Sequence, residues 1–212
     1  MPEPVAYYPL NARYKAAEKE NRQSKGSLWR VSIANGPYNE PGGAYMFHGI
    51  DESYILFPNR GGLDTRFSTT LMCWVRPGGQ DGTLFHYVRG VHMQIFDGKF
   101  YNEIVKRKHF QLFTGIRTAE VLPIGKWVHV AASYDHNTGN NSLYINGQFS
   151  VSQNIGKGHE IETTDHVIMG SLFKGKIAEM KIYDVALNEI QIQTSIKQGN
   201  CSFPEIVVSS PS

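Results

Sequence analysis

The sequence predicts an all-β fold of antiparallel strands, arranged as a sandwich or a barrel. Short apolar-rich segments recur about every 8 to 12 residues, turns containing Gly or Pro separate them, and one segment alone has helical periodicity. The 212 residues, 41% of them hydrophobic, are enough to enclose one core. We therefore expect one domain over residues 1–202, with a tail or linker at 203–212.

The first quarter of the chain is expected to hold three strands and a long loop. A short strand covers residues 5–10, and the loop at 11–42 follows without a clear hydrophobic period. A turn of helix is expected inside this loop at 15–20. Two further strands, at 44–47 and 53–57, flank a tight turn. Loops this long are usually functional, whether packed as an Ω-loop or mobile.

The middle of the chain alternates strands with tight turns. The Asp97-Gly98 pair is a strong hairpin signal, and the basic cluster Lys106-Arg107-Lys108 forms the last of these loops. The expected strands cover residues 69–76, 83–88, 91–96, 99–105 and 109–114.

A long hairpin follows, because residues 125–135 and 142–147 alternate apolar and polar positions around a short polar loop. Further strands are expected at 148–153, 166–169 and 175–183.

The one predicted helix covers residues 188–197. Asn188 is suited to the N-cap position with Gln191 three residues later, and Ile192 and Ile196 share one helix face.

The hairpin at 125–147 resembles the signature of laminin G and pentraxin-type domains. The segments 7–11, 44–55, 71–75 and 175–187 are similar to the same family, so the resemblance covers nearly the whole chain. It points to the concanavalin A-like lectin/glucanase superfamily and implies an antiparallel two-sheet jelly-roll β-sandwich with one short C-terminal helix. Such domains are mostly extracellular modules that bind glycans, matrix proteins or receptors, and they often sit among other domains of a larger parent protein.

Composition excludes several classes of partner. The 21 basic and 19 acidic residues give a net charge of +2, which does not favour a nucleic-acid groove. No segment approaches the roughly 18 apolar residues that span a bilayer, so we expect no membrane insertion. Following the resemblance, the chain is expected to be extracellular, secreted or part of an ectodomain.

The sequence does not predict an enzyme. Glucanases of this fold carry paired carboxylates on one strand face, flanking the scissile bond. The nearest string, residues 160–165, has its acids in another order and lies in an expected loop. Nucleophile-elbow, zinc-protease and phosphate-loop motifs are also absent from the sequence.

Two candidate ligand-binding regions remain. Lys106, Arg107, Lys108 and His109 form a basic loop that could pair with an acidic or sulfated glycan, or simply guard a strand edge. Trp29, in the 11–42 loop, could stack on a sugar ring or pin the loop to the sandwich.

Metal ions are not required by any motif, although members of the family often use calcium. Weak candidate ligands are Asp51, Glu52, Glu162 and Asp165, while Arg89 stands where the resemblance implies an acid.

Two histidines, His86 and His92, flank a turn where zinc is conceivable, although single surface histidines are commoner.

Two cysteines and two tripeptides complete the candidates. Cys73 is expected to be a buried free thiol, since the position that holds its partner in pentraxins is Ala131. Cys201 could pair with Cys73 only if the tail folds over that strand. Alternatively, it could pair with a cysteine outside the given sequence. Asn140 and Asn200 begin N-glycosylation patterns in expected loops.

The sequence thus favours a non-enzymatic extracellular recognition module, lectin-like or adhesive. A second hypothesis is a structural or oligomerising domain of a larger extracellular or membrane-attached protein, whose ligand is a protein. A glycoside hydrolase relative is the third.

Overall fold

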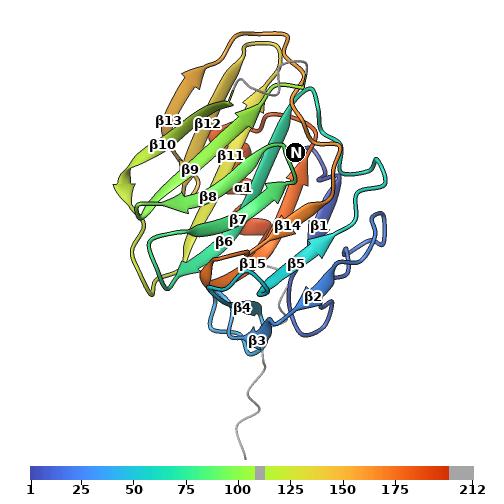
Figure 1. The fold of residues 1–212 in the computed structure, drawn as a ribbon, viewed down its shortest axis with the longest axis vertical. Coiled ribbons are helices and arrows are strands. Elements are labelled where there is room, and N and C mark those ends of the chain that lie inside the picture. The colour runs from blue at the N-terminus through green and yellow to red at the C-terminus, as the bar shows by residue number, and fades with distance from the viewer. Residues whose placement is uncertain (108–112, 201–212) are drawn as a thin grey trace, which may run out of the picture.

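Two antiparallel sheets pack face to face in the computed structural model, which describes residues 1–107 and 113–200 (Figure 1). The predicted two-sheet jelly-roll sandwich with one short C-terminal helix is therefore confirmed. No helix in the described ranges is both long and apolar enough to cross a membrane.

The larger sheet contains eight of the described strands, in the order β13-β12-β11-β6-β15-β4-β3, with β1 added beside β15. The long hairpin expected from the sequence, β11 and β12, lies toward one edge and sets Val130 opposite Ile145, while β6 is in the middle of the order. The strands are β1 (Ala6–Tyr8), β3 (Ser32–Ala34), β4 (Ala44–His48), β6 (Thr69–Pro77), β11 (Val128–Asp135), β12 (Asn140–Ile145), β13 (Gln148–Asn154) and β15 (Lys174–Tyr183).

The smaller sheet contains seven of the described strands, in the order β10-β9-β8-β7-β14-β5-β2, and faces the viewer in Figure 1. The Asp97-Gly98 turn joins β8 to β9 and sets Phe96 opposite Lys99, as its hairpin signal predicts. The strands are β2 (Ser27–Trp29), β5 (Tyr54–Phe57), β7 (Gly82–Tyr87), β8 (His92–Phe96), β9 (Lys99–Val105), β10 (Phe113–Val121) and β14 (Val167–Met169).

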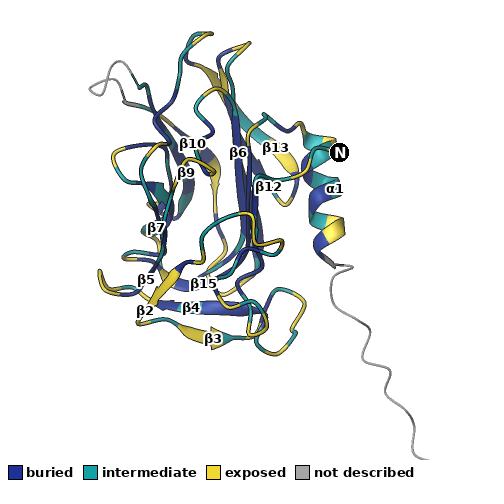
Figure 2. Cartoon of the chain, turned by 90° about the vertical axis from the view of Figure 1, so that its right-hand side faces the viewer, coloured by how far each residue is buried: buried dark blue, intermediate teal, exposed yellow. Residues whose placement is uncertain are grey.

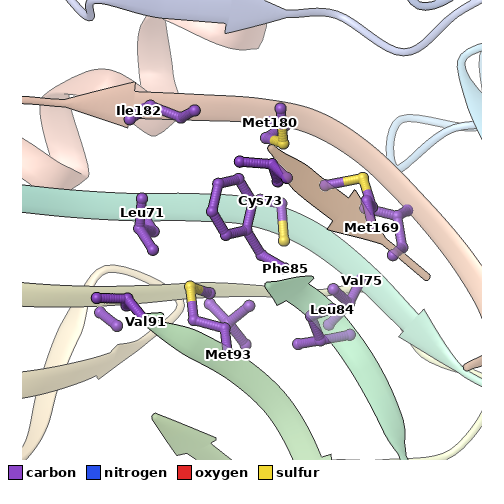
Figure 3. Packing of buried hydrophobic residues seen from close by; sticks show 14 of the residues in the cluster. Leu71, Cys73, Val75, Leu84, Phe85, Val91, Met93, Met169, Met180 and Ile182 are labelled. Carbon is purple, nitrogen blue, oxygen red and sulfur yellow. The ribbon is translucent and has the colours of Figure 1, made fainter. Parts of the chain in front are cut away.

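The core lies between the two sheets, because alternate residues of each strand point into this space. Figure 3 shows Cys73 of β6 among Leu71, Phe85 and Met180 of the hydrophobic cluster. Cys73 is 1% exposed and forms no disulfide with a described residue, as expected for a buried thiol. Cys201 lies outside the described residues.

The helix α1 (Glu189–Asn200) covers the outer face of the eight-stranded sheet (Figure 2). Asn188 and Gln191 form the expected capping box: Asn188 Oδ1 accepts from the Gln191 amide at 3.0 Å, and Gln191 Oε1 accepts from the Asn188 amide at 2.9 Å. Ile192 is buried against Met72 and Tyr144, so apolar packing fixes the helix on the sheet.

The 11–42 segment differs from the expected loop in two ways. It contains the short strands β2 and β3, which lengthen both sheets by pairing with β5 and β4. Residues 15–20 form turns and irregular backbone, with Lys15 in an isolated β-bridge to Asn11, instead of the expected turn of helix. The reason is the left-handed φ of Lys15, 55°, which a right-handed helix cannot include.

The strand expected at 109–114 extends beyond its expected end. β10 runs from Phe113 to Val121, while residues 109–112 lie outside the described ranges. Gly115, which normally weakens a strand, sits inside β10 opposite Glu103.

Candidate functional site

The outer face of the seven-stranded sheet carries polar and aromatic side chains from three neighbouring strands. Every second residue of β8 is buried, and the same alternation holds for the first six residues of β9. The remaining residues of these segments therefore point outward. The strand register then places His86 opposite His92, and Gln94 opposite Tyr101. These side chains, with their neighbours Phe96 and Glu103, are defined here as the sheet-face site.

Tyr101 is the centre of the sheet-face site. Its ring lies across Gly115, where a Cβ atom would collide with the phenol. Its hydroxyl donates to Glu103 Oε2 at 2.7 Å, and Phe96 lies 6.3 Å away, centroid to centroid. Burial, followed by the hydrogen bond and charge of Glu103, raises the pKa of Tyr101 to about 12. The phenol therefore stays protonated and holds the carboxylate in place.

Two histidines extend the site along the sheet. The rings of His86 and His92 stack with centroids 4.6 Å apart, and Glu103 lies directly opposite His92 in the register. Burial lowers the pKa of His92 to about 4, with a smaller contribution from His86. Burial, followed by His166, also lowers the pKa of His86. Both rings are neutral at pH 7, and His92 Nε2 is buried without a hydrogen-bond partner.

This arrangement is suited to hydroxyl-rich ligands. A carboxylate, an amide and imidazoles supply hydrogen-bond donors and acceptors on one surface, while the rings of Tyr101 and Phe96 supply apolar area. Sequence reasoning missed Gln94, Tyr101 and Glu103. Their signal was the Asp97-Gly98 turn, which fixes the register and so brings the outward residues of two strands together.

Trp29 lies at the far edge of the same sheet. Its ring stacks on Tyr54 with centroids 5.9 Å apart, yet it remains 52% exposed, so it both packs on the sheet and offers a free face. Five strand steps separate β2 from β9, which corresponds to about 24 Å. Trp29 and the sheet-face site are therefore separate contact points for a ligand.

The basic loop is only partly described. Lys106 Nζ donates to the carbonyl of Ile155 at 2.8 Å, and Arg107 lies 3.9 Å from Glu160 and 4.0 Å from Glu162. The charged groups of Lys106 and Arg107 therefore already have partners within the fold. Lys108 and His109 lie outside the described residues.

The weak metal candidates do not form one cluster. Asp51 and Glu52 are exposed in the turn before β5, whereas Glu162 and Asp165 precede β14 at the opposite end of the sandwich. Arg89 pairs with Asp165 at 3.0 Å. Across the described ranges, no three His, Cys, Asp or Glu side chains come together as metal ligands. The two stacked histidines likewise lack a third ligand.

The two glycosylation candidates differ in setting. Asn140 is exposed at the start of β12, whereas position 200 ends α1 instead of lying in a loop. Helix α1 continues to this position because its apolar face packs on the sheet. Cys201 and Ser202 of the second pattern are outside the described ranges, and glycosylation at both positions stays a prediction.

The fold and this surface define a lectin-like β-sandwich. The profile described as "Concanavalin A-like lectin/glucanases superfamily", a laminin G-type family, matches residues 49–193. The chain belongs to this superfamily. No curated protein matches it.

Several solved structures share the fold at low sequence identity. The binding domain of Paraclostridial Mosquitocidal Protein 1 has a TM-score of 0.76 and 16% identity, covering 92% of this chain and 52% of that one. Domain 4 of AbnA, an extracellular GH43 arabinanase from Geobacillus stearothermophilus in complex with arabinotriose, has a TM-score of 0.72 and 21% identity, covering 91% and 97%.

The ligand-binding domain of botulinum neurotoxin serotype D, in complex with N-acetylneuraminic acid, has a TM-score of 0.74 and 13% identity. The alignment covers 92% of this chain and 50% of the toxin chain. The chain thus spans about half the length of the toxin domains it matches.

Proposed function

We propose that this chain is a non-enzymatic, extracellular recognition module that binds carbohydrate on the outer face of its seven-stranded sheet. The observation that carries the proposal is the juxtaposition of Tyr101, Glu103 and Gln94, which combines an aromatic ring with fixed polar groups. Sugar rings present apolar C–H faces and vicinal hydroxyls, so they match such a surface.

Two of the similar structures support a glycan ligand. One was solved with arabinotriose and another with N-acetylneuraminic acid, and both contain this sandwich. The extracellular location of the arabinanase agrees with the expected location of this chain. Trp29 and the basic residues Lys106 to His109 are proposed as outlying contacts for a longer or acidic glycan.

Catalysis is not part of the proposal. Glycoside hydrolysis uses two carboxyl groups that flank the scissile bond. The strands β7, β8 and β9 contain one acidic residue, Glu103, and its Oε2 already accepts a hydrogen bond from Tyr101.

A glycan array, run with calcium and with EDTA, tests the proposal. We expect binding that weakens about tenfold or more in Tyr101→Ala and Gln94→Ala, because a stacked ring or a hydrogen bond is lost. Phe149→Ala is the matched control, since Phe149 is an exposed aromatic on β13 of the other sheet. Equal affinity of wild type and Tyr101→Ala would contradict the assignment.

The basic loop is tested separately. Replacing Lys106, Arg107 and Lys108 by Gln should weaken binding to sulfated glycans and leave neutral glycans unaffected. Equal losses for both glycan classes would remove the loop from the proposed site.

A protein ligand is the second candidate, and one end of the sandwich favours it. Backbone hydrogen bonds join the loops there: Gly49 to Phe173 at 3.0 Å, Gly125 to Pro77 at 2.7 Å and Leu122 to Gly98 at 2.7 Å. Exposed apolar side chains lie on these loops and on the strand ends beside them, at 40% to 57% exposure: Ile50, Phe96, Val121, Ile124 and Leu172. Such a grouped apolar surface is typical of protein interfaces.

Sedimentation and the array together separate the candidates. A concentration-dependent dimer that Leu172→Asn abolishes, with silence on the array, would favour the protein ligand. Asn suits the left-handed φ of Leu172, 58°, so this change removes apolar area without adding backbone strain.

A further inference from the structure

A cleft of about 650 Å³ opens on the outer side of the eight-stranded sheet, far from the sheet-face site. It lies between the N-terminal segment, the loop at 19–22 and the last turn of α1. Its charged lining residues are the cations Lys19, Arg22 and Lys181 and the carboxylates Glu3 and Glu20, and the ring of Tyr7 lies beside them. Its volume is in the range of sites for small molecules.

Two ammonium groups face one ring in this cleft. Lys181 Nζ lies 5.0 Å and Lys19 Nζ 5.5 Å from the centroid of Tyr7. The β1–β15 register places Tyr7 directly opposite Lys181, and the Lys19 amide donates to the Tyr7 carbonyl at 2.8 Å. Backbone pairing therefore holds both lysines beside the ring.

Lys181 is built into the fold and is not a flexible surface lysine. It is 6% exposed, and its Nζ donates to the carbonyl and the hydroxyl of Ser195 at 2.9 and 3.1 Å. These neutral acceptors and the π face of Tyr7 compensate only part of its charge.

Neither ammonium forms a salt bridge with a carboxylate in the described part of the chain. Arg22, by contrast, is paired with Glu18 at 3.3 Å and with Glu3 at 3.7 Å. The carboxylate of Glu18 also accepts from the backbone amides of Tyr7, Glu20 and Arg22. Lys19 and Lys181 are thus the lysines of this wall that have no carboxylate oxygen within 4 Å among the described residues.

The charges around Lys181 favour a further negative group beside it. Burial lowers the pKa of Lys181; the buried carboxyl of Glu179 opposes this effect, and the charge of Lys19 adds to it. An anion beside both lysines would stabilise the two charged forms together.

We propose that this cleft binds an acidic small molecule, with its oxyanion (sulfate, phosphate or carboxylate) held by Lys19 and Lys181. The cleft is larger than a bare ion, so the acidic group is carried by a body such as a saccharide unit. The site lies on the opposite sheet from the proposed carbohydrate face and does not depend on it.

Amide NMR titration of the whole chain tests the proposal, with sodium sulfate compared against sodium chloride at equal ionic strength. Sulfate should give saturating shifts at Tyr7, Lys19 and Gly199, and chloride should not. In Lys19→Gln the apparent Kd should rise about tenfold, the loss of one charge-assisted contact. The matched control, Lys126→Gln, removes an exposed lysine elsewhere and should bind as wild type.

A second arm uses N-acetylglucosamine 6-sulfate and its unsulfated parent to identify the source of the oxyanion. Tighter binding of the sulfated sugar than of sulfate supports an acidic saccharide, and equal binding supports the oxyanion alone as the ligand. Non-saturating shifts with both anions, or unchanged affinity in a folded Lys19→Gln variant, would overturn the proposal. If sugar binding at Tyr101 proves absent, we still expect sulfate to bind in the cleft.

Discussion

His86 and His92 stack across β7 and β8 with ring centroids 4.6 Å apart and an interplanar angle of 29°. Two imidazoles in this contact are stable when both are neutral, because two imidazolium rings would repel each other. Burial also favours the neutral rings, because it lowers the pKa of both histidines. The sheet-face site is therefore built from neutral rings at pH 7 and changes its charge in acid.

The first prediction concerns pH. The pKa of His92 is lowered to about 4, and that of His129 to about 3, by burial first and then by a neighbouring residue. Since unfolded histidines titrate near pH 6.5, the folded chain binds protons more weakly. The stabilisation is complete above about pH 6.5 and is lost as the pH falls toward 4.

His92→Phe keeps a flat ring and removes the titration. Wild type should lose about 2 kcal/mol more free energy of unfolding than this variant between pH 7 and pH 5. Urea unfolding at both pH values measures it, with exposed His48→Asn as the control. Identical pH dependence in wild type and His92→Phe would contradict the burial argument.

The second prediction concerns a buried hydroxyl. Thr70 is 0% exposed; its Oγ1 donates to the Val185 carbonyl at 2.8 Å and accepts from the Leu187 amide at 2.8 Å. Thr70→Val keeps the shape but leaves both backbone groups without a partner. We expect a loss of about 2 to 4 kcal/mol in the free energy of unfolding.

Thr194→Val is the control for Thr70, because the Thr194 hydroxyl bonds to the Ile190 carbonyl near the helix surface. Its effect should stay within about 0.5 kcal/mol. Similar losses for both variants would show that the buried pair of hydrogen bonds is not what anchors the segment before α1.

The third prediction concerns Cys73. Burial raises the pKa of this thiol to about 12, so the reactive thiolate is scarce at neutral pH. In a Cys201→Ser background, iodoacetamide should leave the native protein unmodified and add one adduct after denaturation. Mass spectrometry measures the difference. Rapid labelling of the native protein would mean that the core around β6 opens.

The sequence predicts the central elements because their signals are local. The hairpin of β11 and β12 has alternating faces and defined turns, and α1 has a cap and an apolar stripe. β2 and β3 have neither: each is three residues long and mostly exposed, and they form by pairing with β5 and β4. Whether such short edge strands form is determined by pairing with neighbouring strands and not by the β-propensity of their own residues.

The sheet-face site was harder to predict than the fold. Tyr101 and Glu103 are ordinary strand residues in the sequence. They become part of a site only because Gly115 on β10 leaves room for the ring of Tyr101 and the register with β8 places Gln94 and His92 opposite them. The residues singled out by type were charged or lone aromatic side chains. Lys106 and Arg107 already have partners within the fold.

The fourth prediction concerns metal ions. The acidic candidates lie at opposite ends of the sandwich, and the carboxylate of Asp165 is already paired with Arg89 at 3.0 Å. Addition of EDTA should therefore leave the melting temperature and glycan binding unchanged. A fall in melting temperature that calcium restores would contradict this prediction.

Mapping a bound glycan onto the two sheets tests directly whether carbohydrate binds at the sheet-face site. The array ligand with the highest affinity is titrated into the labelled chain, and amide shifts are recorded together with those of Tyr101→Ala and Phe149→Ala. We expect the largest saturating shifts to fall on β7, β8 and β9 around Gln94 and Tyr101, and Tyr101→Ala to need about tenfold more glycan to reach them. Shifts confined to the apolar loop end or to the eight-stranded sheet would contradict it.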